Sequence, residues 1–346
     1  MRKILIILTG GTIGSKKESN IINVSKNNYV ETFLKKNFQE KIKYKIIKPI
    51  NILSENALPS DWNKIIKSIR ENWEEDFSGI IITHGTDTLS YVSSALSQYF
   101  SNFTKPIVIV SSDKPLNNKK ANGRSNLLSA VKFILDTKLR GVFVAFKNPN
   151  ENFVSFFLGS RVQEIASFDN KLKSVDGNVF CKYKNFKFKY IKNKLNPSIK
   201  SLKKKKNKLN SNLIFSNKIL IIKSFPGINY KYLNIKKNKP KAILHSLYHS
   251  GTANTKNKEV GFVSLKDFIS LCNSKKIPIY FAPIFLDKKN IYQSLKDLLG
   301  MGIKIINNTS FETAYSKLSL SYGSFKSQTK ISNFIKQNNF YEKIIS

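Results

Sequence analysis

Two short loops carry the residue types in this sequence that could do chemistry. They are the glycine- and threonine-rich segments 9–14 (TGGTIG) and 84–88 (HGTDT), and each follows directly after a short apolar stretch. Open α/β sheets bind ligands at the carboxyl ends of their strands. The two loops would therefore place two threonines, Thr12 and Thr86, and one carboxylate, Asp87, above the same sheet.

The first loop is not a nucleotide-binding loop of either common kind. Thr9 stands where a dinucleotide fingerprint needs glycine, and Ser15 precedes Lys16, which is not the order of a P-loop. What remains is a glycine turn that lets a substrate approach the backbone and presents the Thr12 hydroxyl, a group that can act as a nucleophile.

Each loop also has a purely structural interpretation. Segment 9–14 alone is compatible with a simple turn, and Asp87 and Thr88 could do no more than cap the helix that follows. We interpret His84 as structural rather than catalytic. The functional interpretation rests on the two loops occurring together.

Strands and helices alternate along the chain in the manner of an α/β protein. Short apolar stretches rich in β-branched residues predict strands, and amphipathic stretches between them predict helices. In the first half we expect strands at 3–9, 79–83, 106–111 and 141–146, and helices at 60–73, 88–102 and 123–137. In the second half we expect strands at 218–224, 241–247, 277–282 and 302–306, helices near 263–274 and 289–299, and closing helices from 310.

The alternation predicts two domains. Residues 1–190 would form a larger N-terminal α/β catalytic domain with a doubly wound, mostly parallel sheet, and 216–346 a smaller C-terminal α/β domain. Between them, 191–215 is polar and lysine-rich, with Pro197 and the run Lys203–Lys206, and is interpreted as a linker.

Composition excludes several classes of protein. The chain has 346 residues, 41% of them hydrophobic, which favours a folded globular protein. No apolar run approaches the roughly 18 residues that span a membrane. Two cysteines and three histidines predict neither a disulfide framework nor a structural zinc site. The N-terminal apolar run is only five residues, too short for a signal peptide, so we expect a cytoplasmic protein.

The formal net charge of +37 suggests contact with polyanions. However, only five of the 59 basic residues are arginine, whereas recognition of base edges favours arginine. An excess of lysine, asparagine and isoleucine is what an AT-rich genome would impose on any protein. We therefore expect non-specific attraction to polyanions and no specific nucleic-acid partner.

The two loops, in this order and spacing, resemble those of the bacterial-type L-asparaginases, amidohydrolases with a threonine nucleophile, and of the cytoplasmic type I in particular. The resemblance extends colinearly across nearly the whole chain. Its supporting segments are 54–62 (SENALPSDW), 105–116 (KPIVIVSSDKPL), 122–130 (NGRSNLLSA), 225–227 (FPG), 248–251 (YHSG) and 309–318.

The resemblance implies a role for each matching residue. Thr12 would attack the side-chain amide carbonyl, and Thr86 would belong to a Thr-Lys-Asp cluster that handles protons and water. Asp87 would hold the substrate ammonium, and Glu55 would lie beside it. The remaining matches are Ser54, which would bind the substrate carboxylate, and Ser112, whose backbone would border the scissile amide. The family also implies a homodimer or homotetramer and no cofactor or metal.

The sequence departs from the family at important places. Glu164 stands where the family carries the lysine of its Thr-Lys-Asp cluster, and a carboxylate near Asp87 would raise at least one carboxyl pKa. Lys171 or Lys173 could replace that lysine if the loop is remodelled. Three further departures are Ile21 near the place of the family tyrosine, with Tyr29 as the nearest alternative, Asn122 in place of an aspartate, and Pro283-Ile284 in place of a Gln-Cys pair.

Three hypotheses follow. The leading one is an amidohydrolase that converts L-asparagine, or a related amide, to the acid and ammonia through Thr12. The second is a catalytically impaired relative that binds an amino acid or has been re-purposed. The third is a polyanion-binding protein that uses the charge of +37.

Overall fold

The computed structural model describes residues 2–18, 21–24, 29–38, 42–204, 212–235, 237–256, 260–284 and 291–344, without the side chains of 16–24. The chain divides into two compact units. The first covers the chain up to Asn212 together with Asn339–Glu342, and the second covers Leu213–Asn338.

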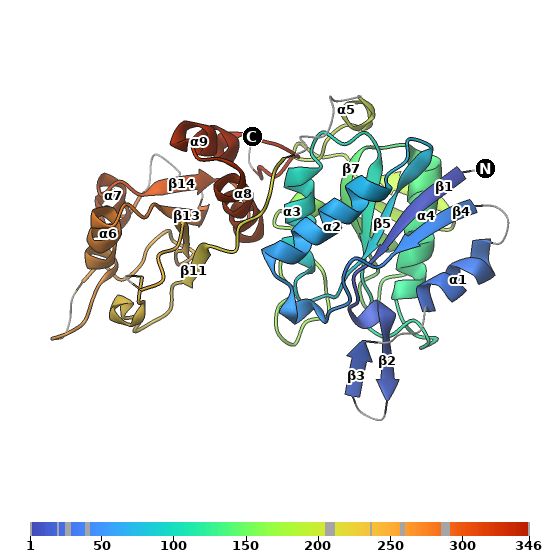
Figure 1. Cartoon of the computed structure of the whole chain (residues 1–346), viewed down its shortest axis with the longest axis horizontal. Helices are drawn as coiled ribbons and strands as arrows, with labels where there is room; N and C mark the ends of the chain where they lie inside the picture. The colour runs from blue at the N-terminus through green and yellow to red at the C-terminus, as the bar shows by residue number, and fades with distance from the viewer. Residues whose placement is uncertain are drawn as a thin grey trace. The chain divides into compact units, whose positions relative to one another are not determined.

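The first unit is built on an eight-stranded sheet with the order β10-β9-β8-β7-β6-β5-β1-β4 (Figure 1). The neighbours from β4 to β7 are parallel, and those from β7 to β10 are antiparallel. The strands are β1 (Arg2–Leu8), β4 (Ile42–Ile47), β5 (Phe77–Thr83), β6 (Pro106–Val110), β7 (Gly141–Phe146), β8 (Val154–Leu158), β9 (Cys181–Lys184) and β10 (Lys187–Tyr190). The four predicted strands of this half are present, and the sequence did not predict β4 or the antiparallel extension.

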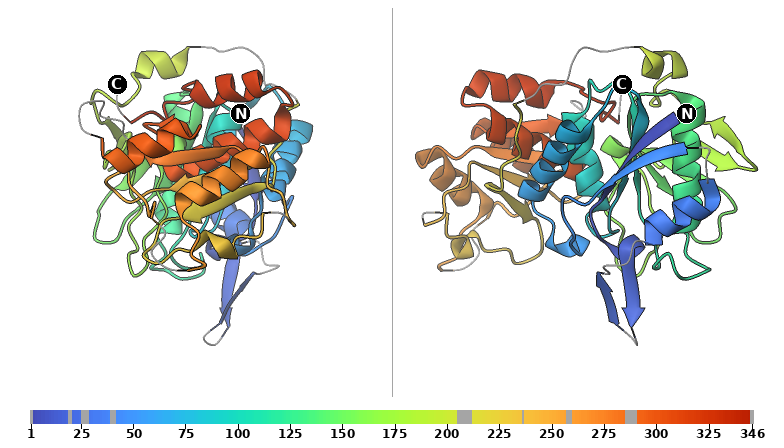
Figure 2. Two further views of the ribbon diagram at one scale, coloured as in Figure 1. Left: turned by 90° about the vertical axis from the view of Figure 1, so that its left-hand side faces the viewer. Right: turned by 45° about the vertical axis from the view of Figure 1, so that its right-hand side comes forward.

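Helices cover both faces of the parallel part of this sheet (Figure 2). On one face lie α1 (Tyr29–Phe38) and α4 (Gly123–Thr137), and on the other lie α2 (Pro59–Asn72) and α3 (Leu89–Tyr99). Alternate residues of β1 pack toward the two faces, and Ile4 and Ile6 join the core under α1 and α4. Because both faces are buried, the strands are continuously apolar, which is why the sequence predicted them. A small hairpin, β2 (Ser15–Glu18) and β3 (Ile21–Val24), follows β1.

The second unit is a four-stranded parallel sheet with the order β11-β12-β13-β14. Its strands are β11 (Ile219–Lys223), β12 (Ala242–Ser246), β13 (Ile279–Ile284) and β14 (Lys304–Asn307). One core cluster lies under α6 (Leu265–Ser274) and α7 (Gln293–Gly300), and the other under α8 (Phe311–Ser324) and α9 (Gln328–Lys336). All four predicted strands are present, so the α/β class of this half is confirmed.

The first part of the lysine-rich stretch packs against the first unit. Here α5 (Ile199–Lys203) buries Leu202 completely, and the Leu202 carbonyl accepts a hydrogen bond from the Arg140 backbone amide at 3.0 Å. Residues 205–211, which include part of the lysine run, lie outside the described residues. The division into a catalytic domain 1–190, a linker 191–215 and a second domain 216–346 stays a prediction.

The chain returns to the first unit near its end. Phe340 is 1% exposed and packs against Gly141, where a Cβ would lie only 1.9 Å from the phenyl ring. The Glu342 carboxylate is also buried and accepts hydrogen bonds from the backbone amides of Asn339 and Phe340 at 2.9 and 2.8 Å. None of the helices in the described ranges is long and apolar enough to cross a membrane.

Candidate active site

The two loops identified from the sequence lie together above the sheet. The loop after β1 forms a short 3-10 turn, η1 (Thr12–Gly14), behind Gly10 and Gly11, whose φ angles are 98° and 72°. A Cβ on Gly11 would lie 2.4 Å from the backbone nitrogen of Gly85. Glycine is therefore needed at position 11 both for its left-handed backbone and for the close contact between the two loops.

A third loop, the segment 52–56, completes the cluster. The Gly11 amide donates to the Ile52 carbonyl at 2.9 Å, which ties this segment to the loop after β1. Its 3-10 turn, η2 (Ser54–Asn56), holds the buried Ser54, whose hydroxyl donates to Asp87 Oδ2 at 2.9 Å. A Cβ on Gly85 would lie 2.3 Å from Ser54 Oγ, so this glycine also permits a close approach.

His84 connects the three loops from beneath. Its Nδ1 lies 3.0 Å from Thr9 Oγ1, and its Nε2 lies 3.0 Å from Thr88 Oγ1. The two hydroxyls also donate to backbone carbonyls, Thr9 to Thr83 at 2.6 Å and Thr88 to Ser54 at 2.9 Å. A neutral ring can donate to only one of the two hydroxyls, so its tautomer is fixed by which threonine turns its hydrogen toward the ring. The structural interpretation of His84 fits this arrangement.

Burial lowers the pKa of His84 to about 4, although the Asp87 carboxylate acts in the opposite direction. The unfolded chain, with an ordinary histidine pKa near 6.5, then binds more protons than the folded chain between about pH 4 and pH 6.5. Stability contributed by neutral His84 is therefore complete above pH 6.5 and is lost as the pH falls toward 4. We expect about 2 kcal/mol of this loss between pH 8 and pH 5.

Urea unfolding of the wild-type protein and of the His84→Gln variant at pH 8 and pH 5 measures this effect. The variant should be less stable at pH 8, because hydrogen bonds to both threonines change, but its stability should fall less on acidification. An equal fall in both proteins would contradict the assignment. His245, which is also buried with its pKa lowered to about 4, contributes equally to both proteins.

The exposed rim of the cluster has the groups that an amino acid needs. Thr12 and Thr86 are half-buried, while Asp87 and Glu55 are exposed. Carboxylates can bind an ammonium group, and hydroxyl and backbone donors can bind a carboxylate. The cluster can thus hold a zwitterion beside two threonine hydroxyls.

Ser112 lies on the next strand end, after β6, and is buried. Its hydroxyl bonds within its own loop, to the Lys114 carbonyl and from the Gly123 amide at 3.1 Å. Asn122, the residue in place of the family aspartate, exchanges hydrogen bonds of 2.9 Å with Asp113 and donates to the Lys147 carbonyl at 2.8 Å. Asn122 therefore closes the loop that carries Ser112.

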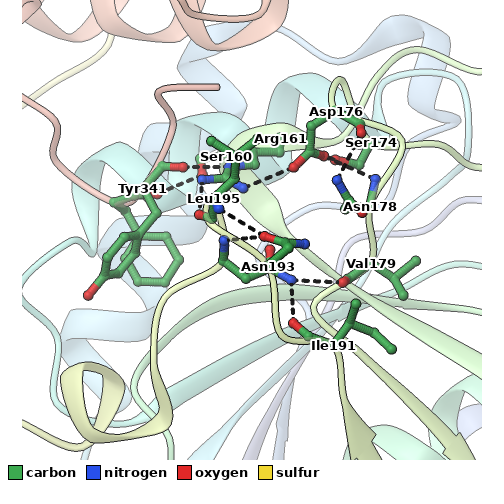
Figure 3. Close-up of polar contacts among 12 residues, drawn as sticks. Ser160, Arg161, Ser174, Asp176, Asn178, Val179, Ile191, Asn193, Leu195 and Tyr341 are labelled. Atoms are coloured by element: carbon green, nitrogen blue, oxygen red, sulfur yellow. Dashed lines mark hydrogen bonds and ion pairs between the residues drawn. The ribbon is translucent and has the colours of Figure 1, made fainter. Parts of the chain in front are cut away.

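Glu164 lies on a fourth segment and is exposed. It follows η3 (Gly159–Arg161), which is anchored by the buried Arg161 (Figure 3). This guanidinium donates to the Tyr341 carbonyl at 2.6 Å, to the Leu195 carbonyl at 2.7 Å and to Asp176 Oδ2 at 3.1 Å. The segment that ends in Glu164 is therefore held in place by three other parts of the first unit.

The alternatives to the missing lysine and tyrosine have other contacts. Lys173 Nζ pairs with Asp169 Oδ2 at 2.9 Å, and Lys171 is exposed. Tyr29 packs against the hydrophobic core of the first unit. Ile21 begins β3, whose side chains lie outside the described residues. In the second unit, Pro283 and Ile284 border a cavity of about 510 Å³.

The ion pair of Arg161 and Asp176 should contribute strongly to stability, because each side chain is only 4% exposed. We expect Asp176→Asn to destabilise the protein by about 3–5 kcal/mol, since it leaves a buried guanidinium without its counter-charge. Chemical denaturation measures the change. The matched control is Asp169→Asn in the same loop, which breaks an ion pair whose lysine is 60% exposed, and whose loss should cost about 1 kcal/mol or less. Equal losses in the two variants would contradict the assignment.

Sequence reasoning did not assign Thr9 and Thr88 to the site. Both flank the motifs, and a hydroxyl residue at the end of each motif is the only sequence signal for them. In the described part of the chain, no three His, Cys, Asp or Glu side chains are grouped so that they could hold a metal ion.

The fold and these loops define the class of protein. Residues 3–193 match the family model described as "Asparaginase, N-terminal", so the chain belongs to the asparaginase family. Solved structures agree in fold across both units. The thermostable L-asparaginase from Thermococcus kodakarensis has a TM-score of 0.79 at 23% identity, over 99% of this chain and 100% of that one. L-asparaginase I from Vibrio cholerae has a TM-score of 0.78 at 21% identity, over 99% of both chains. The predicted two-domain asparaginase-like fold is confirmed.

Curated relatives carry a different name, that of the glutamyl-tRNA(Gln) amidotransferase subunit of type D. The chain is 28% identical to this protein of Methanococcus maripaludis strain C7 over 292 residues, which are 82% of this chain and 66% of the relative. It is 26% identical to the protein of the same name from Methanobrevibacter smithii, over 97% of this chain and 76% of the relative. The chain thus spans about two thirds to three quarters of these two relatives.

Proposed function

We propose that this protein hydrolyses the side-chain amide of L-asparagine, or a related amide, to the acid and ammonia. The observation that carries the proposal is the convergence of the three loops, in which the Ser54 hydroxyl donates to Asp87 beside the Thr12 turn. A site of this kind has a hydroxyl nucleophile and an anion for the substrate ammonium within one cluster.

In the proposed reaction the Thr12 oxygen adds to the amide carbonyl, and the C–N bond breaks. The hydroxyl proton leaves with the amide nitrogen as ammonia, and the substrate remains as an ester of Thr12. Water then cleaves the ester, which releases the acid and restores the hydroxyl. Thr86 would take part in the proton transfers, and Asp87, Ser54 and Glu55 would hold the amino acid. Ser112 would border the amide through its backbone. The proposed reaction needs no cofactor or metal.

A second function is favoured by the names of the relatives. Proteins named as part of an amidotransferase for glutamyl-tRNA(Gln) resemble this chain over most of its length. In that role the ammonia would be passed on instead of released, and the chain would need a partner protein. Ammonia release from an isolated chain would then be slow until the partner was added.

Glu164 supports the alternative of a catalytically impaired, amino-acid-binding protein. If it lies where the family lysine lies, the site keeps its binding groups Asp87, Ser54 and Glu55 but lacks a base. Loss of a positioned base typically costs about 10²–10⁴ in rate.

The test is ammonia release from L-asparagine and L-glutamine by the purified protein, beside the Thr12→Ala variant. Release that depends on Thr12 supports the amidohydrolase. Binding of L-aspartate by calorimetry without any release supports the impaired relative. Light scattering on the same samples tests the proposed homodimer or homotetramer, and cell fractionation tests the proposed cytoplasmic location.

A further inference from the structure

The antiparallel edge of the first sheet presents a ladder of lysines. In the β9–β10 hairpin, Lys182 pairs directly with Lys189, and Lys184 with Lys187. The residues between them, Tyr183 and Phe188 among others, turn the opposite way and pack against the hydrophobic core. All four lysines therefore lie on one face, which we call the lysine ladder, and Lys184, Lys187 and Lys189 are exposed.

This arrangement costs stability in the free protein. Side chains directly opposite in an antiparallel pair lie about 5 Å apart, and like charges there repel. Lysines on an edge strand can serve to block unwanted strand pairing, and this would explain Lys187 and Lys189 of β10. It does not explain Lys182 and Lys184, because β9 is an interior strand paired on both sides.

The turn of the hairpin adds an aromatic ring to the same edge. Asn185 and Phe186 form the turn with φ angles of 48° and 59°, and Phe186 is 85% exposed. Glycine and asparagine suit such a turn, whereas a bulky residue with positive φ is strained. Phe186 is thus unfavourable both for its backbone and for its exposed ring. An exposed ring beside cations is a surface on which an unpaired base can stack.

The other end of the ladder is hollowed. Lys182 Nζ lies over the Phe153 ring, 4.2 Å from its centre, and Lys182 also lines a cavity of about 680 Å³. Ser155 and Phe157 of β8 line the same cavity, together with Glu151, whose carboxylate accepts a hydrogen bond from Ser155 at 3.4 Å. Glu151 is a carboxylate at this end of the face.

We propose that the lysine ladder and Phe186 form a docking surface for single-stranded or looped RNA. Lysines two residues apart on a strand are separated by about 7 Å, so the ladder offers two parallel columns of cations to a phosphate backbone. Lysine is a point charge without the fork that reads bases, so binding should tolerate any sequence. The proposal goes beyond the proposed amide hydrolysis and does not depend on it.

The first test compares two triple variants that each lose three exposed lysines. One changes Lys184, Lys187 and Lys189 to glutamine, and the other changes Lys326, Lys330 and Lys336 on and beside α9, which are also exposed. The probe is a fluorescein-labelled 20-nucleotide oligouridylate, titrated from about 50 to 200 mM salt. The ladder variant should bind at least about tenfold more weakly at low salt, and its log–log salt slope should fall by about 2. The α9 variant should stay within about twofold of wild type.

The second test uses the aromatic ring. Phe186→Gly should raise the melting temperature, because glycine relieves the strained turn, yet it should weaken RNA binding at least about fivefold. Phe168→Gly is the matched control, since Phe168 is also fully exposed with a φ of 65°. That variant should raise the melting temperature and leave RNA binding unchanged.

Three outcomes would overturn the proposal. Equal losses in the two triple variants would mean that only net charge matters, and equal effects of the two glycine variants would remove the aromatic contact. Poly-L-glutamate that displaces the RNA at an equal concentration of charges would show a general polyanion surface. Ammonia release by the ladder variant is measured in parallel, so a failed hydrolase assay and a failed RNA assay are distinguished.

Discussion

Replacing Thr12 by alanine is expected to lower amide hydrolysis by at least about a thousandfold, because the variant lacks the hydroxyl that would form the ester with the substrate. Thr12→Ser keeps a hydroxyl on the same turn and should retain measurable activity. The measurement is the steady-state rate of ammonia release with saturating L-asparagine and L-glutamine. Binding of L-aspartate should survive in both variants, since the proposed contacts to the amino acid come from Asp87 and Ser54.

Protein folding is controlled within the same experiment. Thr12 is half-buried in a turn held by backbone hydrogen bonds, among them one from Gly14 to Gly11 at 3.1 Å. The alanine variant should therefore melt close to the wild-type temperature. If the alanine and wild-type proteins release ammonia at the same rate, Thr12 is not the nucleophile.

Replacing Glu164 by lysine is expected to raise the rate of amide hydrolysis by about 10²-fold or more. Lysine would restore the amine that the family carries at this position, and it would remove a carboxylate that repels the negative charge of Asp87. Arg161 anchors the preceding residues with three hydrogen bonds, so the new side chain should start from the same backbone position. The measurement is kcat against pH, where a new basic limb should report the lysine.

Two variants control for charge alone. Glu164→Gln removes the carboxylate without adding an amine, and Gln163→Lys adds an amine on the neighbouring exposed residue. Both should change the rate by less than about tenfold. A lysine variant no faster than the glutamine variant would mean that the missing base is not what limits turnover.

The sequence predicted those parts of the fold whose signal is local. Strands such as β5 and β7 are apolar throughout because helices cover both of their faces, and such runs stand out in a sequence. Edge strands have a weaker signal. In β4 only Ile42 is fully buried, and in β9 and β10 every second residue is lysine, so neither stretch looks like a buried strand. The antiparallel extension therefore needed the structure.

The candidate site divides in the same way. Loops 9–14 and 84–88 could be located because each follows a strongly predicted strand. Ser54 was found only through the family resemblance, since its loop meets the others through contacts between residues such as Gly11 and Ile52 that are far apart in sequence. The hydrogen bonds of His84 were also hidden, because the ring is held between Thr9 and Thr88.

The return of residues 339–342 to the first unit has a consequence for synthesis on the ribosome. The Phe340 ring fills the space beside Gly141, and Ser160 and Arg161 donate to the carbonyls of Phe340 and Tyr341. About two hundred residues of chain follow Gly141 before Phe340 is made. The N-terminal unit therefore cannot complete its core while the chain is still growing. A nascent chain should carry an open apolar site at Gly141 until its last residues emerge, and a chaperone would have that whole interval in which to bind there.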